Sequence, residues 1–278
     1  MTQASMARWT RYRNCSLTCR TRVKPYNRGR RSPDNPRPGL AFLGGYRRCW
    51  SRHRRHRGHG GGRRVLVALE GIDGSGKTTT VPIVAARLRE KGYSAVEAEK
   101  RTSIVRQGFA REQLDAVAAR LWSVPHDARL GSLGTLHWVY LNAAYFAGTH
   151  YALAEELGPR DIVVFDNWIN KFVARIASNG EMPLDEALDA IALLPKPDCV
   201  FLLDVDPATV ASRRQFSDLE RGALRDGSLD FAAYQSEVRE NLIRMAKRFD
   251  WVVVTPGDRT VDEVAEELAD LIAAGVGE

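Results

Sequence analysis

The amino-acid sequence predicts an α/β fold: a five-stranded parallel sheet with helices on both faces. Three observations support this fold class. From Val65 onward, short apolar runs rich in β-branched residues alternate with longer stretches of helical period. A glycine-rich loop connects the first apolar run to the first helical stretch. Acidic residues follow two later apolar runs, at the ends where parallel strands form ligand sites.

The elements follow one another in the order that crossover connections require. Strands are expected at Val65–Glu70, Ser94–Glu99, Ile162–Phe165, Cys199–Asp204 and Trp251–Thr255. Helices are expected at Lys77–Lys91, Arg111–Trp122, Leu133–Leu157, Ile169–Ser178, Leu184–Leu194, Pro207–Arg214, Asp230–Phe249 and Val261–Ala274. Residues 65–278 then form one domain.

Residues 1–64 differ from the rest of the chain in charge. They hold 18 of the 41 Lys and Arg residues and one acid, Asp34, which gives +17, whereas the remainder carries −10. This tail has no sustained apolar pattern, so we expect it to be disordered. An organelle transit peptide, a nucleic-acid-binding segment and a mis-set translation start are three interpretations. We favour the mis-set start, and the intact mass of the protein from its native host tests it.

Cysteine content and hydropathy bound the protein class. Four cysteines in a chain of 278 residues do not form a disulfide framework, and no secretory segment is visible. No apolar run approaches the ~18 residues that cross a bilayer. We therefore expect a soluble, cytoplasmic protein with no membrane partner, and nucleic-acid binding only through the basic tail.

The stretch Gly71-Ile72-Asp73-Gly74-Ser75-Gly76-Lys77-Thr78 is a phosphate-binding loop. Its glycines let the backbone fold tightly enough for several N–H groups to converge on phosphates. Lys77 is expected to reach the β and γ phosphates of ATP, and the Thr78 hydroxyl to bind Mg²⁺. The expected nucleotide-binding residues are Gly71, Asp73, Gly74, Ser75, Gly76, Lys77, Thr78 and Thr79.

Acidic residues end two later strands. Asp166 closes a buried strand, where a carboxylate can hold the metal or its water, so we assign it to the Mg²⁺ site and to catalysis. Asp206 precedes Pro207 and is more simply a helix cap.

Arginines between residues 212 and 225 supply positive charge for the transferred phosphoryl group. We interpret residues 213–229 as a mobile lid whose guanidinium groups close over ATP, with Arg213, Arg214 and Arg221 as catalytic residues and Arg225 as a fourth cation. The alternative is an ordinary solvated loop.

Residues 65 to 275 resemble the thymidylate kinases, a family of P-loop nucleoside monophosphate kinases. The similarity is strongest in LEGIDGSGKTT, which includes Glu70 and Asp73. The resemblance implies a nucleotide substrate, a homodimer, and a role for Asp73 in orienting the acceptor. Some members carry Arg at the position of Gly74; members without it take their cations from the lid.

The acceptor side departs from the family pattern. The family's Asp-Arg-Tyr or Asp-Arg-His is here Asp166-Asn167-Trp168, and its Arg-Glu-Pro-Gly-Gly segment is Glu99-Lys100-Arg101-Thr102-Ser103. Phe146 stands where an acceptor-phosphate arginine is expected, and Arg175-Ile176 replaces the Tyr-Gln pair. Neutral side chains cannot replace bidentate arginines. Candidates to compensate are Lys100, Arg101, Lys171 and Arg175.

The leading hypothesis is Mg²⁺- and ATP-dependent phosphoryl transfer to a nucleoside monophosphate, as in dTMP + ATP → dTDP + ADP. A second hypothesis keeps ATP but changes the acceptor to a nucleoside or specialised metabolite. An aromatic acceptor pocket would then be formed by Trp138, Tyr140, Tyr145, Phe146 and Trp168, although aromatic residues spaced along a helix are usually core. A third hypothesis is a non-catalytic nucleotide-binding protein.

Overall fold

A computed structural model describes residues 64–99, 105, 108–123, 130–158, 161–212, 215–218, 220–222 and 230–277. The basic tail therefore lies outside the described residues, apart from Arg64. In the described part of the chain, five parallel strands form one sheet in the order β2-β3-β1-β4-β5. The strands are β1 (Val65–Glu70), β2 (Ala95–Glu99), β3 (Ile162–Asp166), β4 (Cys199–Leu203) and β5 (Val252–Val254).

Helices connect these strands. They are α2 (Lys77–Glu90), α3 (Gly108–Trp122), α4 (Thr135–Glu156), α5 (Asn170–Ser178), α6 (Leu184–Ala190), α7 (Pro207–Ala211), α8 (Phe231–Phe249) and α9 (Val261–Gly277), with a 3₁₀ turn η2 (Leu130–Leu133) before α4. The predicted α/β fold with a parallel sheet is confirmed, and the predicted elements all occur.

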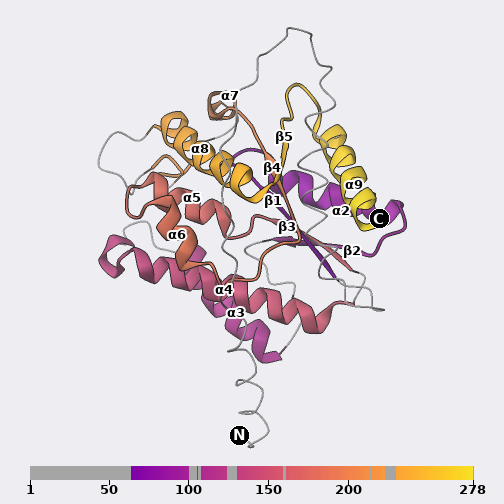
Figure 1. Ribbon diagram of the computed structural model, residues 1–278, viewed down its shortest axis with the longest axis horizontal. Helices are drawn as coiled ribbons and strands as arrows, with labels where there is room; N and C mark the ends of the chain where they lie inside the picture. Colours follow the sequence, from indigo (N-terminus) through magenta and orange to yellow (C-terminus); the bar gives the residue numbers. More distant parts are fainter. Residues whose placement is uncertain are drawn as a thin grey trace, which may run out of the picture. The chain divides into compact units, whose positions relative to one another are not determined.

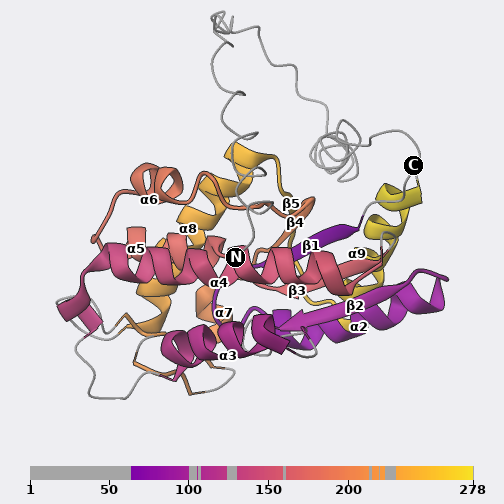
Figure 2. The same ribbon diagram turned by 90° about the horizontal axis from the view of Figure 1, so that it is seen from below.

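The central strand β1 pairs with β3 on one side and β4 on the other. All six of its residues are buried, because helices cover both faces of the sheet. Helices α2 and α9 pack together on one face, while α3, α4, α5 and α8 lie on the other (Figure 1). In Figure 2, seen from below, α9 lies to the right of the strands, and α5, α6 and α8 lie to the left. Two apolar clusters follow from this arrangement, one on each face of the sheet.

The ends of several elements differ from the sequence predictions. Helix α6 ends at Ala190 rather than Leu194, because Ile191 leaves the helical conformation with φ −109° and ψ 11°. Helix α7 ends at Ala211, three residues earlier than expected, and β5 is limited to three residues. Asp206 caps α7 as predicted, because its side chain accepts a hydrogen bond from the Ala208 N–H.

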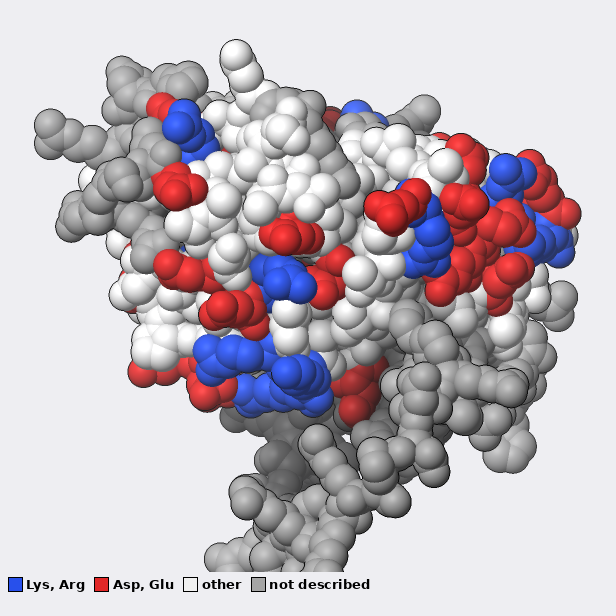
Figure 3. Space-filling view, turned by 90° about the horizontal axis from the view of Figure 1, so that it is seen from above, with Lys and Arg blue, Asp and Glu red and all other residues white. Residues whose placement is uncertain are grey.

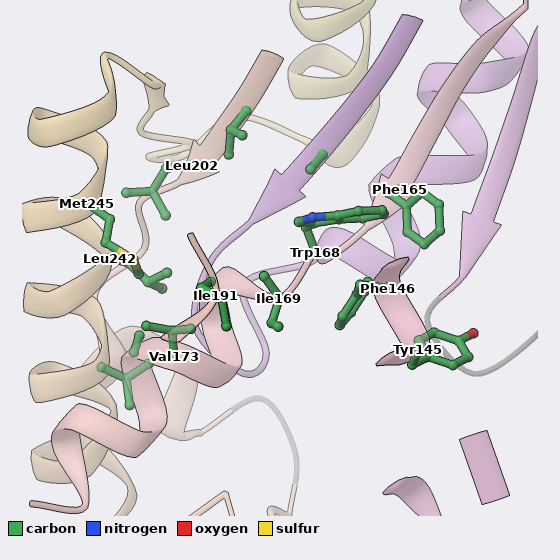
Figure 4. Packing of buried hydrophobic residues seen from close by; sticks show 14 of the residues in the cluster. Tyr145, Phe146, Phe165, Trp168, Ile169, Val173, Ile191, Leu202, Leu242 and Met245 are labelled. Carbon is green, nitrogen blue, oxygen red and sulfur yellow. The ribbon is translucent and has the colours of Figure 1, made fainter. Parts of the chain in front are cut away.

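Three aromatic residues that were candidates for an acceptor pocket belong to the core instead. Tyr145, Phe146 and Trp168 are each at most 3% exposed. The ring of Phe146 contacts the rings of both Tyr145 and Trp168 (Figure 4). The indole N–H of Trp168 donates to the carbonyl of Pro195 at 3.2 Å. Tyr140 is 57% exposed on the outer side of α4. Tyr145 and Phe146 lie on the buried side of α4 and Trp168 follows β3, so these three residues pack in the core instead of forming the predicted aromatic pocket.

Charged side chains on the described surface are mixed in sign. On the face shown in Figure 3, Lys and Arg side chains lie among Asp and Glu side chains. Ion pairs between α2 and α9, such as Lys91 with Glu266 and Asp270, are examples of this mixing. None of the helices among the described residues is long and apolar enough to cross a bilayer.

Candidate functional site

The glycine-rich loop lies at the carboxyl end of β1, between the strand and the first turn of α2. Helix α2 begins at Lys77, and Gly76 before it adopts a left-handed conformation with φ 94°. The first N–H groups of a helix have no partner within the helix and carry partial positive charge. This end of the sheet therefore presents backbone donors to an anion.

Two glycines of the loop have no room for a side chain. A Cβ on Gly71 would lie 2.8 Å from the carbonyl oxygen of Leu203, and one on Gly74 would lie 2.4 Å from Val210. Gly74 also has a φ of 76°, which L-residues rarely adopt. An arginine at position 74 would meet both Val210 and the ring of Phe216. The loop geometry thus requires the glycines that the sequence supplies.

Lys77 is buried and folds back into the loop. Its ammonium donates to the carbonyl oxygens of Gly71 and Ile72 at 3.0 and 2.7 Å, and to the hydroxyl of Ser75 at 2.8 Å. In this type of loop, backbone N–H groups converge on the phosphates. The loop carbonyls hold the Lys77 ammonium at that place. The structure brings Gly71, Ser75 and Lys77 together, and their role in nucleotide binding stays a prediction.

Thr78 and Asp166 bring a hydroxyl and a carboxylate together where β3 ends. Thr78 Oγ1 donates to Asp166 Oδ2 at 2.6 Å, and Asn167 Nδ2 donates to Asp166 Oδ1 at 2.9 Å. Mg²⁺ prefers oxygen ligands, keeps several waters and takes one or two protein groups. The Thr78–Asp166 pair suits this ion, and the described residues contain no cluster of three or more His, Cys, Asp or Glu that would suggest another metal.

Asp73 is engaged by side chains from two helices. Its Oδ1 accepts from the Lys171 ammonium at 2.7 Å, and its Oδ2 accepts from Gln235 Nε2 at 3.0 Å. Arg175 Nη1 lies 4.0 Å from Oδ2. Burial opposes ionisation of Asp73, but the ammonium of Lys171 and the guanidinium of Arg175 hold the pKa of its carboxyl well below the usual range. Asp73 therefore joins the loop to α5 and α8.

Glu70, the last residue of β1, is fully buried beside the loop. Its Oε1 accepts from the backbone N–H of Trp168 at 3.0 Å and from Asn170 Nδ2 at 2.9 Å. Its Oε2 is buried and has no hydrogen-bond partner among the described residues. Burial raises the pKa of Glu70 to about 7, against the lowering effects of Asn170 and Trp168. The site therefore contains one carboxyl that titrates near neutral pH.

The segment predicted as a lid is described only in part. Arg213, Arg214 and Arg225 lie outside the described residues. Arg221 is exposed, and its backbone N–H donates to the Ser217 carbonyl at 3.1 Å. The carbonyl of Glu220 accepts from Gln235 Nε2 at 2.8 Å, so Gln235 connects this segment to the loop. Catalytic roles for the lid arginines stay predictions.

Ser75 and Thr79 complete the set of predicted nucleotide-binding residues. Ser75 is buried in the loop, and Thr79 is exposed in the first turn of α2, with its backbone N–H donating to the Gly76 carbonyl.

Gln235 belongs to the site although no sequence motif assigned it a role. A signal was available, because Gln235 occupies an apolar-period position of α8 between Phe231 and Val238. A polar residue on a buried helix face requires a partner, which here is Asp73.

Comparisons with known proteins find thymidylate kinases among the relatives of this chain. No protein-family model matches this chain. A probable thymidylate kinase of Sulfolobus acidocaldarius is 25% identical over 209 residues, covering 74% of this chain and 95% of that protein. A thymidylate kinase of Xanthomonas euvesicatoria pv. vesicatoria is 28% identical over 202 residues, covering 73% of this chain and 77% of that protein.

One solved structure supports the fold. The thymidylate kinase of Candida albicans superposes with a TM-score of 0.53 at 17% identity, covering 76% of this chain and 92% of that chain. This chain therefore shares the fold of that protein.

Proposed function

From the premise that this chain is a relative of the thymidylate kinases, we propose that it transfers the γ-phosphoryl group of ATP to a nucleoside monophosphate. The proposal makes it a Mg²⁺-dependent phosphotransferase, and dTMP is the first acceptor to test. The relatives in the sequence comparison are named for that reaction.

The observation that carries the proposal is the joint placement of Lys77, Thr78 and Asp166. The ammonium lies inside the loop, and the hydroxyl and carboxylate are in contact beside it. A phosphate-binding loop next to a Mg²⁺ pair is the arrangement that phosphoryl transfer from a nucleoside triphosphate uses. A loop that bound phosphate only for structure would have no need of a carboxylate paired with Thr78.

Each residue then has a physical task. Backbone N–H groups from Gly71 to Gly76 bind the phosphate oxygens, and Lys77 neutralises their charge. Thr78 and Asp166 would hold Mg²⁺ directly or through water; the ion offsets charge on the phosphates. No residue forms a covalent intermediate, so the chain contributes positioning and charge neutralisation. Arginines of the predicted lid would supply further positive charge.

The acceptor side favours a second candidate function, which is the same transfer to a different acceptor. Two positions where the family pattern has an arginine hold neutral side chains here and present no cation. Phe146 lies in the core, and Asn167 donates a hydrogen bond to Asp166. An acceptor-binding site built without those arginines must recognise its substrate by other groups.

The test is ATP consumption by the full-length protein with Mg²⁺ across a panel of acceptors. The panel contains dTMP, the other nucleoside and deoxynucleoside monophosphates, and the matching nucleosides. Turnover with dTMP or another nucleoside monophosphate supports the first candidate, and turnover with a nucleoside supports the second. ATP binding without turnover on any acceptor contradicts both and leaves a nucleotide-binding protein.

A further inference from the structure

The Lys171 ammonium is buried at the phosphate loop with hydrogen-bonding capacity to spare. Only 8% of its side chain is exposed. Among the described residues it makes one hydrogen bond, to Asp73 Oδ1. An ammonium carries three N–H donors, and a buried charge is costly unless its donors are satisfied. Two donors of Lys171 therefore call for further oxygen atoms.

Asp73 orients this ammonium but cannot satisfy it alone. The second carboxylate oxygen of Asp73 accepts from Gln235, and Gln235 Oε1 in turn accepts from the Asp73 backbone N–H at 3.2 Å. This reciprocal pair fixes the carboxylate between the loop and α8. Asp73 is thus a positioning residue for the Lys171 ammonium.

Two polar atoms at the carboxyl ends of β1 and β3 are unsatisfied. Glu70 Oε2 and Asn167 Oδ1 are buried and have no hydrogen-bond partner in the described part of the chain. Glu70 binds Asn170, which directly precedes Lys171, and the Lys171 ammonium lowers the pKa of Glu70. Native interiors leave few such atoms unpaired, and an unpaired group commonly marks a place that a ligand or an ion completes.

Arg175 extends this site by one helical turn. It lies four residues after Lys171 on α5, so both cations project from the same face of that helix. Its guanidinium is partly exposed, lies 4.0 Å from Asp73, and donates to the Tyr234 hydroxyl at 3.4 Å. The carboxylate of Glu220 also acts on Arg175 electrostatically. Lys171 is thus the buried end of a cationic stripe whose outer end solvent can reach.

We infer that Lys171 binds an oxyanion of the phosphoryl acceptor, with Arg175 beside it. The inference rests on the proposed function and names the acceptor class: a compound that carries a phosphate or a carboxylate. The oxyanion accepts from the two remaining donors of Lys171. Lys171 thereby supplies a cation that the neutral side chains of Asn167 and Phe146 cannot.

Calorimetry on the protein already saturated with MgADP tests this inference. The ligands are dTMP and the other nucleoside monophosphates, the matching nucleosides, and nucleosides with a 5′-carboxylate. Wild type is expected to bind at least one anionic compound tighter than its neutral nucleoside. Lys171→Met is expected to weaken that binding by about 10- to 100-fold and to leave the nucleoside unaffected, because hydrogen bonds to a charged donor are lost. Lys171→Arg is expected to restore part of it.

Lys247→Met is the matched control, since Lys247 is an exposed lysine on α8. If Lys171→Met weakens only the binding of the monophosphate, the anion is a phosphate. If it weakens only the binding of the 5′-carboxylate compound, the anion is a carboxylate. Equal binding of the anion by wild type and Lys171→Met overturns the inference, as does an ADP-loaded wild type that binds none of the anions.

A folding defect would not hide the answer. If Lys171→Met fails to bind MgADP, the double variant Asp73→Asn with Lys171→Met removes both charges and keeps an amide for Gln235. Anion binding by this double variant at wild-type strength overturns the inference. Failure of wild type to bind MgADP contradicts the proposed function instead, so the two failures are distinguishable.

Discussion

At the scale of single residues, the phosphate loop is specified by local requirements. Gly74 must adopt a left-handed φ and must leave space for Val210, while Lys77 must reach loop carbonyls only five or six residues away. Both requirements lie within one short stretch of sequence, and the motif therefore predicted this part of the site. The burial of Glu70 could not be predicted in this way, because it depends on Asn170 and Trp168, about one hundred residues along the chain.

Substitution of Gly74 tests the close packing of the loop. Gly74→Ala is expected to lower the free energy of unfolding by about 1–3 kcal/mol beyond the cost of left-handed backbone, since its Cβ would meet Val210. Gly92→Ala is the matched control: Gly92 has a φ of 87° and nothing within 4 Å of a Cβ. It should cost about 1–2 kcal/mol from backbone strain alone. Urea unfolding measures both, and equal losses would contradict the packing argument.

Glu70 makes stability depend on pH near neutrality. Its pKa is about 7 in the folded protein and lower when unfolded, so the folded state binds the proton more tightly. The stability associated with the protonated carboxyl is present at pH 4.5 and is lost as pH rises through 7. A shift from 4.5 to about 7 corresponds to about 3 kcal/mol.

Glu70→Gln removes this titration and keeps an amide oxygen for Trp168 and Asn170. The free energy of unfolding of wild type, measured in urea from pH 5 to pH 8, is expected to fall relative to the variant and then level off. Parallel profiles across that range would show that Glu70 does not titrate in this window.

At the scale of elements, the fold brings together side chains that the sequence separates widely. The apolar periods predicted the strands and helices, since each pattern lies within one element. The pairing of Asp73 with Lys171 and Gln235 spans 98 and 162 residues, so it depends on how α5 and α8 pack against the sheet. The aromatic residues of α4 show a similar limit of prediction. Their spacing indicates that one side of the helix is buried, but whether that side packs in the core or forms a pocket depends on how the helix packs.

Gln235 tests the link between α8 and the phosphate loop. Gln235→Met removes hydrogen bonds to the Asp73 side chain, the Asp73 N–H and the Glu220 carbonyl. The free energy of unfolding is expected to fall by about 3 kcal/mol because buried groups lose their partners. MgADP affinity is expected to weaken as well, because the loop loses an anchor.

Asn241→Met is the control for this link. Asn241 joins the same helices, α8 and α5, through Ser178 at 3.0 Å, and none of its hydrogen bonds in the described part of the chain reaches the loop. It should lower stability without changing MgADP affinity, which calorimetry measures. Weakened MgADP binding by Asn241→Met, or unchanged binding by Gln235→Met, would contradict the assignment.

At the scale of the whole molecule, the charge difference between the tail and the rest sets a prediction about the first 64 residues. A variant that begins at Arg64 is expected to fold and to bind MgADP with the affinity of the full chain. Arg64 is retained because its guanidinium donates to the carbonyl of Ala154 at 2.9 Å and so caps the end of α4. The full chain is expected to be retained on heparin and the shortened one to flow through, since residues 65–278 carry −10. Loss of MgADP binding on shortening would show that the tail contributes to the site.

The most direct measurement is calorimetric titration of MgADP into the full-length protein, its Lys77→Met variant and the Lys247→Met control. Wild type and the Lys247 variant are expected to bind with dissociation constants on the order of micromolar, within the usual range for enzymes and their substrates. Lys77→Met is expected to bind at least about 100-fold more weakly while it retains the wild-type circular dichroism spectrum. A folded wild type that takes up no MgADP, or a Lys77→Met variant that binds it as well as wild type, would contradict the assignment of residues 71–78 as the nucleotide site.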